Sequence, residues 1–270
     1  MKITFLGGGN MAAALIGGLV KQGFKAADVQ AVELSAEGRA KLESQFGVRA
    51  VESLDEQALA CDVLVLAVKP QQLKAAVAPI AGRLTTQVVV SIAAGLRLVD
   101  IGRWLGDYHT LVRAMPNTPA LIGAGITGLF ADASVSAAGR AAAEQVLAAV
   151  GSTVWVTDEA QIDGVTAVSG SGPAYVFHFI ECLQAAGESL GFDEATARKL
   201  AIDTVLGAAK LAADSDEAPG VLRERVTSKG GTTAAALASF AADGFPAIVT
   251  RAVAAAEARG RELGEQLGRD

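Results

Sequence analysis

Residues 3–12 read ITFLGGGNMA, and they give the clearest indication of the fold. Its first four residues are mostly apolar and predict a β-strand. Residues 10–22 carry apolar side chains at helical spacing and predict an amphipathic helix. Between strand and helix, Gly7, Gly9 and Ala12 form the G-x-G-x-x-A pattern that is typical of a strand–turn–helix unit binding a dinucleotide.

Each small residue of this pattern has a physical task. Gly7 makes a tight turn, Gly9 leaves room for a pyrophosphate beside the backbone, and Ala12 lets the helix pack closely on the strand. The N–H groups from Asn10 onward have no helical partner and are free to meet the pyrophosphate. A glycine-rich turn without a ligand is the alternative, but the flanking strand and helix favour a dinucleotide site.

Strand-like and helical segments alternate from this unit as far as residue 156. The strands are continuous apolar runs, which is typical of strands buried on both faces of a parallel sheet covered by helices. We therefore predict an α/β fold with a doubly wound parallel sheet of the Rossmann type. Further strands are expected at 29–34, 63–68, 88–92, 111–115, 126–130 and 154–156, and helices at 36–46, 73–84, 98–105 and 136–150.

The pattern changes near Asp158, after which no strand is expected. Five helices are expected at 173–190, 193–213, 219–226, 233–242 and 245–267. The predicted division is residues 1–158, a dinucleotide-binding Rossmann domain, and residues 159–270, an all-helical domain. Because these helices are apolar on more than one face, we expect the second domain to form a homodimer.

Composition excludes several classes of partner. The 270 residues are 51% apolar and carry a net charge of −6. An acidic surface repels a phosphate backbone, so no nucleic acid partner is expected. The longest clean apolar run, residues 63–68, is too short to span a bilayer, and the glycine-interrupted start does not resemble a signal peptide. We expect a cytoplasmic protein with no membrane partner.

Cysteine and histidine are too scarce for most metal or hydrolytic sites. The two cysteines, Cys61 and Cys182, lie far apart in apolar surroundings, and we expect two buried thiols and no metal. The two histidines, His109 and His178, are expected to be structural. A Ser/His/Asp triad is therefore not indicated.

The end of the second predicted strand bears on the choice between NADH and NADPH. Glu33 stands where an acid commonly bonds both ribose hydroxyls and repels a 2′-phosphate, which favours NADH. The hydroxyl of Ser35 is able to bond a phosphate and makes this preference mild. We therefore expect NADPH or NADH as cofactor, with both residues at the cofactor site.

Three more loops follow predicted strands, at the edge of the sheet where Rossmann ligands bind. Their candidate cofactor residues are Val68, Lys69, Pro70, Ala93, Ala94 and Asn117. An ordinary surface lysine is the alternative interpretation of Lys69. The amide of Asn117 either bonds the nicotinamide or holds its own loop by a side-chain turn.

Two segments rich in glycine and hydroxyl groups precede helices in the second half. Residues 169–173, SGSGP, contain Ser171 and let a ligand approach the backbone closely. Residues 227–233, TSKGGTT, place glycines, hydroxyls and free N–H groups at a helix start, which is typical of an anion site. A small carboxylate fits such a site, and a capped helix with a glycine-rich entry is the alternative. No residue stands out as a strong acid, base or nucleophile, as expected where a cofactor carries the chemistry.

Six motifs then occur in order along nearly the whole chain, from Met1 to about Arg261: FLGGGNMAAALIGGL, AVKPQ, SIAAG, RAMPNTPA, SGSGPAYVF and VTSKGGTTAAAL. Together they closely resemble the pyrroline-5-carboxylate reductase family. The resemblance implies reduction of the C=N bond of 1-pyrroline-5-carboxylate by NAD(P)H, the last step of proline biosynthesis. It also implies a Rossmann domain followed by a helical substrate-binding and dimerisation domain, with dimers that often gather into decamers.

The resemblance assigns roles to individual residues. It implies cofactor contacts at Gly7, Gly9, Asn10, Met11, Lys69, Pro70, Ala93, Ala94 and Asn117. The implied substrate residues are Ser228, Gly230, Gly231, Thr232 and Thr233, to which the SGSGP segment adds Ser171. Thr233 matches a threonine that bonds the ring nitrogen, so it is the candidate catalytic residue. Some members have asparagine or arginine at the positions of Glu33 and Leu34, and these suit NADPH.

Three other functions share parts of this pattern. A reductase of another cyclic imine would have the same two-domain plan. A β-hydroxyacid dehydrogenase would need a catalytic lysine on the first long helix of the second domain, and residues 169–187 contain none. A non-catalytic dinucleotide sensor would have no need of the carboxylate loop at 227–233.

Overall fold

The computed structural model describes residues 1–269 and divides into two compact units. The first unit comprises Met1–Ser171 together with the chain from Ala256 onward, and the second is Gly172–Ala255. The boundary between the compact units follows residue 171, thirteen residues after the boundary at residue 158 that the sequence predicted. The end of the chain also belongs to the first unit. The functional division at 158 stays a prediction.

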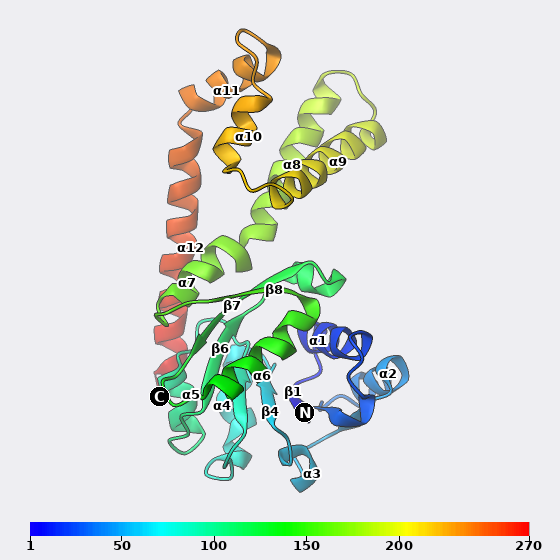
Figure 1. The fold of residues 1–270 in the computed structure, drawn as a ribbon, viewed down its shortest axis with the longest axis vertical. Helices are drawn as coiled ribbons and strands as arrows, with labels where there is room; N and C mark the ends of the chain where they lie inside the picture. The colour runs from blue at the N-terminus through cyan, green and yellow to red at the C-terminus, as the bar shows by residue number, and fades with distance from the viewer. Residues whose placement is uncertain (270) are drawn as a thin grey trace. The chain divides into compact units, whose positions relative to one another are not determined.

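An eight-stranded sheet forms the centre of the first unit (Figure 1), in the order β3-β2-β1-β4-β5-β6-β7-β8. The strands are β1 (Ile3–Leu6), β2 (Val29–Val32), β3 (Arg49–Val51), β4 (Val63–Leu66), β5 (Val88–Ser91), β6 (Leu111–Met115), β7 (Gly125–Ala131) and β8 (Gly151–Trp155). The order reverses at β1, which pairs in parallel with β2 on one side and with β4 on the other. This is the switch point of a doubly wound fold, and the predicted fold class is confirmed.

Helices cover both faces of this sheet. Helices α1 (Asn10–Lys21), α2 (Ala36–Phe46) and α6 (Ala137–Leu147) share one buried cluster, and α3 (Glu56–Leu59), α4 (Pro70–Val77) and α5 (Leu98–Trp104) share the other. Alternate residues of each strand enter different clusters: Phe5 packs with α1, whereas Leu6 packs with α4 and α5. The two-sided burial explains why the strands read as unbroken apolar runs. Short turns complete the unit at η1 (Ala26–Asp28), η2 (Ala78–Ile80), η3 (Thr118–Ile122) and η4 (Ala148–Val150).

Some details of the sheet were not predicted. β3 and α3 contain only three and four residues, too few to show a period in the sequence. β7 runs antiparallel to β6, with Met115 opposite Gly128, while all other neighbouring strands are parallel. The connection at 116–124 is shorter than the roughly dozen residues that a parallel crossover needs, so the chain returns antiparallel.

The structure also has a helical segment between residues 156 and 173, where the sequence analysis assigned no element. Helix α7 (Gln161–Val165) continues into η5 (Thr166–Gly170), a turn with π-helical hydrogen bonding. The N–H of Ser171 donates to the carbonyl of Thr166 at 2.8 Å, five residues back. Ser169 and Gly170 of the SGSGP segment therefore belong to a wide helical turn that ends directly before Ser171, and this turn was not predicted from the sequence.

The second unit contains helices in the described chain and no strand within 172–255. They are α8 (Gly172–Ser189), α9 (Glu194–Ala213), α10 (Pro219–Arg225), α11 (Thr232–Ala242) and the first part of α12 (Phe245–Gly268). Gly187 of α8 lies against Ala197 of α9, so these two helices pack closely. All five predicted helices are confirmed. Cys182 is exposed on α8 in the single chain, whereas a buried thiol was expected there, because a helix apolar all round cannot bury every face within this unit.

Within residues 1–269, no single helix is long and apolar enough to cross a bilayer; α11 and α12 reach that length and composition only as a pair, bent by 54° at the break between them.

The end of α12 joins the first unit through a contact between two glycines. A Cβ on Gly264 would overlap the carbonyl oxygen of Gly95, whereas a Cβ on Gly260, one turn earlier, would meet no described heavy atom within 4 Å. The contact leaves no room for a methyl group at Gly264. The helix therefore approaches the loop after β5 at backbone distance.

We predict opposite effects of alanine at these two positions. Gly264→Ala should lower the free energy of unfolding by about 1–3 kcal/mol, because the backbone on both sides must shift. Gly260→Ala is the matched control in the same helix and should raise it by about 0.5–1 kcal/mol through helix propensity. Denaturant unfolding of both variants measures the difference. Equal shifts in one direction would show that the Gly95–Gly264 contact does not hold α12.

Candidate functional site

The predicted cofactor residues of the first unit lie along one edge of the sheet. Strands β2, β1, β4, β5 and β6 are parallel neighbours, so the loops at their carboxyl ends open on the same edge. Those loops and the first turns of the helices that follow them carry Gly7, Gly9, Asn10, Met11, Ala12, Glu33, Ser35, Val68, Lys69, Pro70, Ala93, Ala94 and Asn117. This edge is where ligands of doubly wound sheets bind.

The glycine turn after β1 has the geometry of a phosphate cradle. Gly7 has φ +106°, and a Cβ there would lie 2.7 Å from the carbonyl oxygen of Ala67, so only glycine fits. Gly9 has an ordinary φ of −66°, and a Cβ there would meet no heavy atom of residues 1–269 within 4 Å. Space beside Gly9 is thus open toward solvent, as close approach of a pyrophosphate requires.

Helix α1 begins without a capping side chain, because its N-cap is Gly9. Within the described chain, the N–H groups of Asn10, Met11 and Ala12 have no hydrogen-bond partner, and the next one, from Ala13, donates to the Gly9 carbonyl at 2.9 Å. Free N–H groups at a helix start attract an anion, and the helix dipole adds to the attraction. These residues therefore fit the pyrophosphate of a nicotinamide dinucleotide.

Glu33 has a second task that the sequence did not reveal. One carboxylate oxygen accepts the N–H of Gly8 at 2.9 Å, and the other accepts the N–H of Ser35 at 2.8 Å. Glu33 thus ties the glycine turn to the loop after β2. Ser35 caps α2 by accepting the N–H of Gly38 at 3.2 Å, and Arg39 donates to the carbonyl oxygens of Glu33 and Leu34.

Asn117 is buried and holds the loop after β6. Its amide nitrogen donates to the hydroxyl of Ser169 at 3.2 Å, and its amide oxygen accepts the N–H of Ile126 at 3.0 Å. This arrangement favours the loop-holding alternative for the side chain, while a contact with the nicotinamide stays a prediction. The same bonds join the loop to the π-helical turn that precedes Ser171.

The remaining strand-end residues are accessible to different degrees. Lys69 is exposed at the N-cap of α4, and Pro70 occupies the first helical position, where its missing N–H costs nothing. Ala93 is buried, and its N–H donates to the Ser91 hydroxyl at 3.3 Å. Ala94 is exposed beside it. Backbone and side-chain groups of both loops thus face the edge where the glycine turn lies.

The predicted carboxylate loop belongs to the second unit. Gly231 is the N-cap of α11, and a Cβ there would lie 2.5 Å from the Ser228 hydroxyl oxygen; Gly230 has φ +71°. The first N–H groups of the helix, from Thr232 and Thr233, have no partner among the described residues. Like α1, helix α11 starts without a capping side chain and offers free donors to an anion.

Sequence reasoning missed a buried cluster of charged side chains in the first unit. Arg113 of β6 is 1% exposed and is paired with Asp163 and Glu159, while Arg97 also contacts Asp163. Burial lowers the pKa of the Arg113 guanidinium, and the two carboxylates oppose that shift. The sequence did contain an indication of this cluster. Arg113 lies inside a strand that was expected to be buried on both faces, and a buried arginine needs a buried partner.

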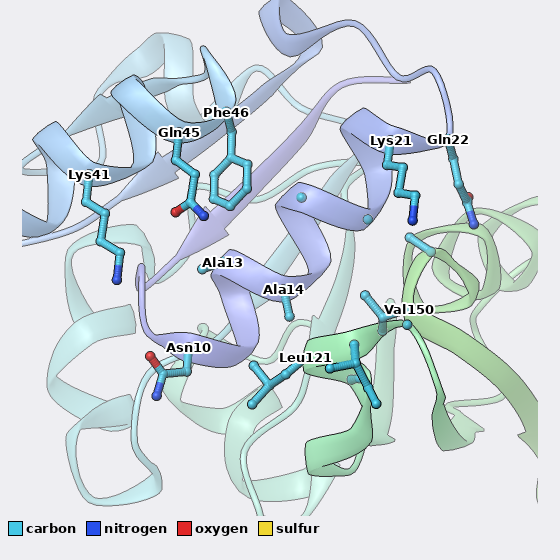
Figure 2. A pocket seen from close by; sticks show the side chains of 16 residues that line it. Asn10, Ala13, Ala14, Lys21, Gln22, Lys41, Gln45, Phe46, Leu121 and Val150 are labelled. Carbon is cyan, nitrogen blue, oxygen red and sulfur yellow. The ribbon is translucent and has the colours of Figure 1, made fainter.

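A separate groove of about 690 Å³ runs along the outer face of α1 (Figure 2). Its walls include Phe46 of α2 and Leu121 of η3, and Lys21 and Lys41 lie along it. Asn10 lines one part of the groove and is the one lining residue that the sequence assigned to the cofactor. The loops that carry the other predicted cofactor residues lie outside it.

The cysteines and histidines bring no further chemistry to this edge. Burial raises the pKa of the Cys61 thiol, so the group stays protonated. His178 pairs with Glu181 at 3.2 Å on the exposed face of α8. Within residues 1–269, no group of three or more His, Cys, Asp or Glu side chains is arranged to hold a metal ion.

Comparison with known proteins assigns both parts of the chain to described families. Residues 159–263 match the family described as pyrroline-5-carboxylate reductase dimerisation. Residues 2–95 match the family described as NADP oxidoreductase, coenzyme F420-dependent. A pyrroline-5-carboxylate reductase of Pseudomonas aeruginosa is 51% identical over 268 residues, which cover 99% of this chain and 98% of that protein.

Solved structures agree with the sequence relatives. A pyrroline-5-carboxylate reductase from Coxiella burnetii superposes with a TM-score of 0.93 at 39% identity, covering 97% of this chain and 98% of that one. A Plasmodium falciparum pyrroline carboxylate reductase with NADP bound gives a TM-score of 0.85 at 29% identity and covers 98% of each chain.

Gly9 provides a direct test of the cofactor site. We predict that Gly9→Ala lowers the affinity for NADPH and NADH at least roughly tenfold, because its methyl group occupies the space that the pyrophosphate needs. The melting temperature should not change, since that methyl group meets no neighbour within residues 1–269. Fluorescence titration of the reduced cofactor and thermal melting measure the two effects. Unchanged affinity would place the pyrophosphate elsewhere.

Glu33 provides a test of cofactor choice. Glu33→Gln keeps an acceptor oxygen for one of the two loop N–H groups, replaces the other oxygen by an NH2 group, and removes the charge that repels a 2′-phosphate. The NADPH/NADH ratio of kcat/KM should therefore rise roughly tenfold. Glu43→Gln, at the far end of α2, is the control and should leave the ratio unchanged. If Glu33 serves only to hold the glycine turn, both cofactors weaken equally in Glu33→Gln and the ratio stays constant.

Proposed function

The chain belongs to the pyrroline-5-carboxylate reductase family, and from that premise we propose how its own residues carry out the reaction. It is an NAD(P)H-dependent oxidoreductase that reduces 1-pyrroline-5-carboxylate to L-proline, the last step of proline biosynthesis. The observation that carries the residue assignment is the pair of helix starts, α1 and α11, that offer free backbone N–H groups and no capping side chain.

The cofactor is held mainly by backbone on the sheet edge. The N–H groups of Asn10, Met11 and Ala12 bind the pyrophosphate, and the open space beside Gly9 admits it. Glu33 and Ser35 face the adenosine ribose, and the loops with Val68, Lys69, Pro70, Ala93, Ala94 and Asn117 line the path toward the nicotinamide. When bound, the reduced nicotinamide supplies a hydride, which adds to the imine carbon while the C=N π electrons move to nitrogen.

The substrate is held by its carboxylate at the start of α11. The N–H groups of Thr232 and Thr233 donate to the carboxylate, with the Ser228 hydroxyl and the backbone of Gly230 and Gly231 beside them. The Thr233 hydroxyl orients the ring nitrogen, and Ser171 adds a hydroxyl contact. A protonated imine needs no further acid, because its nitrogen becomes a neutral amine when the carbon receives the hydride. Orientation of two partners is therefore the main task of the protein.

The protein forms homo-oligomers through its helical part. In the single chain, helices of the second unit expose large apolar side chains, including Phe177, Leu206 and Ile248. Surfaces of this kind mark protein interfaces. We propose that the oligomer is a dimer, that dimers gather into a decamer, and that the enzyme acts in the cytoplasm. Analytical ultracentrifugation at micromolar concentration tests the assembly, and cell fractionation tests the location.

The function itself is tested by mixing the protein, reduced cofactor and 1-pyrroline-5-carboxylate and following the reduced-nicotinamide absorbance. We expect cofactor oxidation that matches the L-proline formed, with both NADPH and NADH. A dinucleotide sensor would bind the cofactor and leave the absorbance constant. A reductase specific for another cyclic imine would turn over a six-membered cyclic imine carboxylate faster than the five-membered one. Either result would contradict the assignment.

Thr233→Val tests the proposed role of the hydroxyl. The change keeps the side-chain shape and removes a polar contact worth about 1–3 kcal/mol, so kcat/KM for 1-pyrroline-5-carboxylate should fall roughly ten- to a hundredfold. NADPH affinity and melting temperature should hardly move, because the helix cap is Gly231 and not this hydroxyl. Thr86→Val, in an exposed loop of the first unit, is the control. Lost NADPH binding in Thr233→Val would place this loop on the cofactor.

A further inference from the structure

Four charged side chains form a buried cluster in the first unit: Arg97, Arg113, Glu159 and Asp163. Arg113 and Asp163 are 1% and 3% exposed. One guanidinium nitrogen of Arg113 donates to Asp163 at 3.0 Å, and the other donates to Glu159 at 3.4 Å. Arg97 donates to the second carboxylate oxygen of Asp163. Asp163 thus receives an arginine on each of its two oxygens.

Each member of the cluster is next to a segment of the sheet edge that we assign to the cofactor or substrate. Arg113 lies on β6, four residues before Asn117. Arg97 follows the loop after β5, and Glu159 accepts the first N–H of α5, from Leu98, at 2.8 Å. Asp163 lies on α7, three residues before the π-helical turn. Three segments that are far apart in the sequence are therefore joined through the carboxylates of Asp163 and Glu159.

The π-helical turn connects the charged cluster to the loop after β6 through direct contacts. Asn117 donates to the Ser169 hydroxyl at 3.2 Å, and a Cβ on Gly170 would lie 2.6 Å from the Met115 side chain. Thr166 at the start of the turn donates its hydroxyl to the Ile162 carbonyl at 2.8 Å. Single π-helical turns inside helices occur frequently at functional sites. Here the turn ends at Gly170, directly before Ser171, the proposed substrate contact.

Stability alone does not account for such a cluster. A buried ion pair seldom stabilises a fold more than well-packed apolar side chains of the same size. Moreover, the Nε of Arg113 is buried without a hydrogen-bond partner in the described chain. The cluster is better explained by the loop geometry that these charges fix. The rate of hydride transfer falls steeply when donor and acceptor are misplaced by about 1 Å.

We propose that Arg113 and Asp163 are positioning residues for the hydride-transfer step, which they serve by fixing the loops after β5 and β6 and the π-helical turn relative to one another. This inference rests on the proposed function of those segments. Neither residue is a catalytic residue, because both side chains are buried and act through Asn117, Ser169 and the loop after β5.

The test compares two variants in single-turnover stopped-flow experiments with the full-length enzyme, NADPH and 1-pyrroline-5-carboxylate. Asp163→Asn removes the central charge. The double variant Arg113→Met with Asp163→Leu replaces the pair by apolar side chains, so that the core stays filled. Arg97 and Glu159 are about one quarter exposed and can turn to water in the double variant. Val146→Ala, on the buried face of α6 and outside the cluster, is the control for loss of stability.

The single-turnover rate constant reports on the positioning role of the cluster, whereas the amplitude reports on the fraction of folded enzyme. We expect the single-turnover rate constant to fall roughly ten- to a hundredfold in both variants at full amplitude. NADPH affinity should change less than about threefold, since the pyrophosphate is held by α1. Val146→Ala should lower the amplitude or melting temperature and keep the rate constant of the unmodified enzyme.

Two results would overturn the inference. Variants with a normal rate constant and a reduced amplitude would show that the cluster only stabilises the fold. A double variant with a normal rate constant and amplitude would show that packing alone positions the loops. Absence of turnover in the unmodified enzyme would instead contradict the proposed function, so the two failures are distinguishable.

Discussion

Helices α1 and α11 begin at glycine N-caps that offer no capping side chain, and the proposed chemistry depends on that constraint. Gly9 precedes α1 and Gly231 precedes α11, whereas Ser35, Ser136 and Asp193 cap α2, α6 and α9 with their side chains. Backbone N–H groups at a helix start require a partner. Where the chain supplies none, an anion is the natural partner, and a reductase of an imino acid brings two: a pyrophosphate on the cofactor and a carboxylate on the substrate.

The sequence predicted the fold well wherever burial in the tertiary structure leaves a recognisable apolar pattern in the local sequence. Unbroken apolar runs such as residues 63–66 indicated strands buried on both faces, and the structure places alternate residues of this run in different clusters. The pattern did not reveal β3, which has three residues, or the direction of β7, which is set by the length of the preceding connection. The π-helical turn at 166–170 was missed because glycine and serine are typical of loops, and only tertiary contacts with Met115 and Asn117 favour a helix there.

The sequence predicted which loops form the candidate site, but it did not predict which residues bond to one another within it. Strand ends and glycine spacing predicted the edge at which we propose that the cofactor binds. They did not show that Glu33 accepts N–H groups from the glycine turn, because its partner Gly8 is distant in sequence. They also passed over Arg113, whose charge inside a buried strand was the one available sign of Asp163. Contacts of this kind depend on the tertiary structure, because the two partners are far apart in the sequence. Residue type and spacing therefore give little indication of them.

In the proposed reaction, a hydride passes directly from the cofactor to the imine carbon of 1-pyrroline-5-carboxylate. The most direct measurement uses the two stereoisomers of NADPH deuterated at nicotinamide C4, with mass spectrometry and NMR of the product. With direct transfer, one stereoisomer should deliver a single deuterium to every L-proline molecule, at the ring carbon that was the imine carbon. Deuterium released to water from both stereoisomers, or cofactor binding without any proline formed, would contradict it.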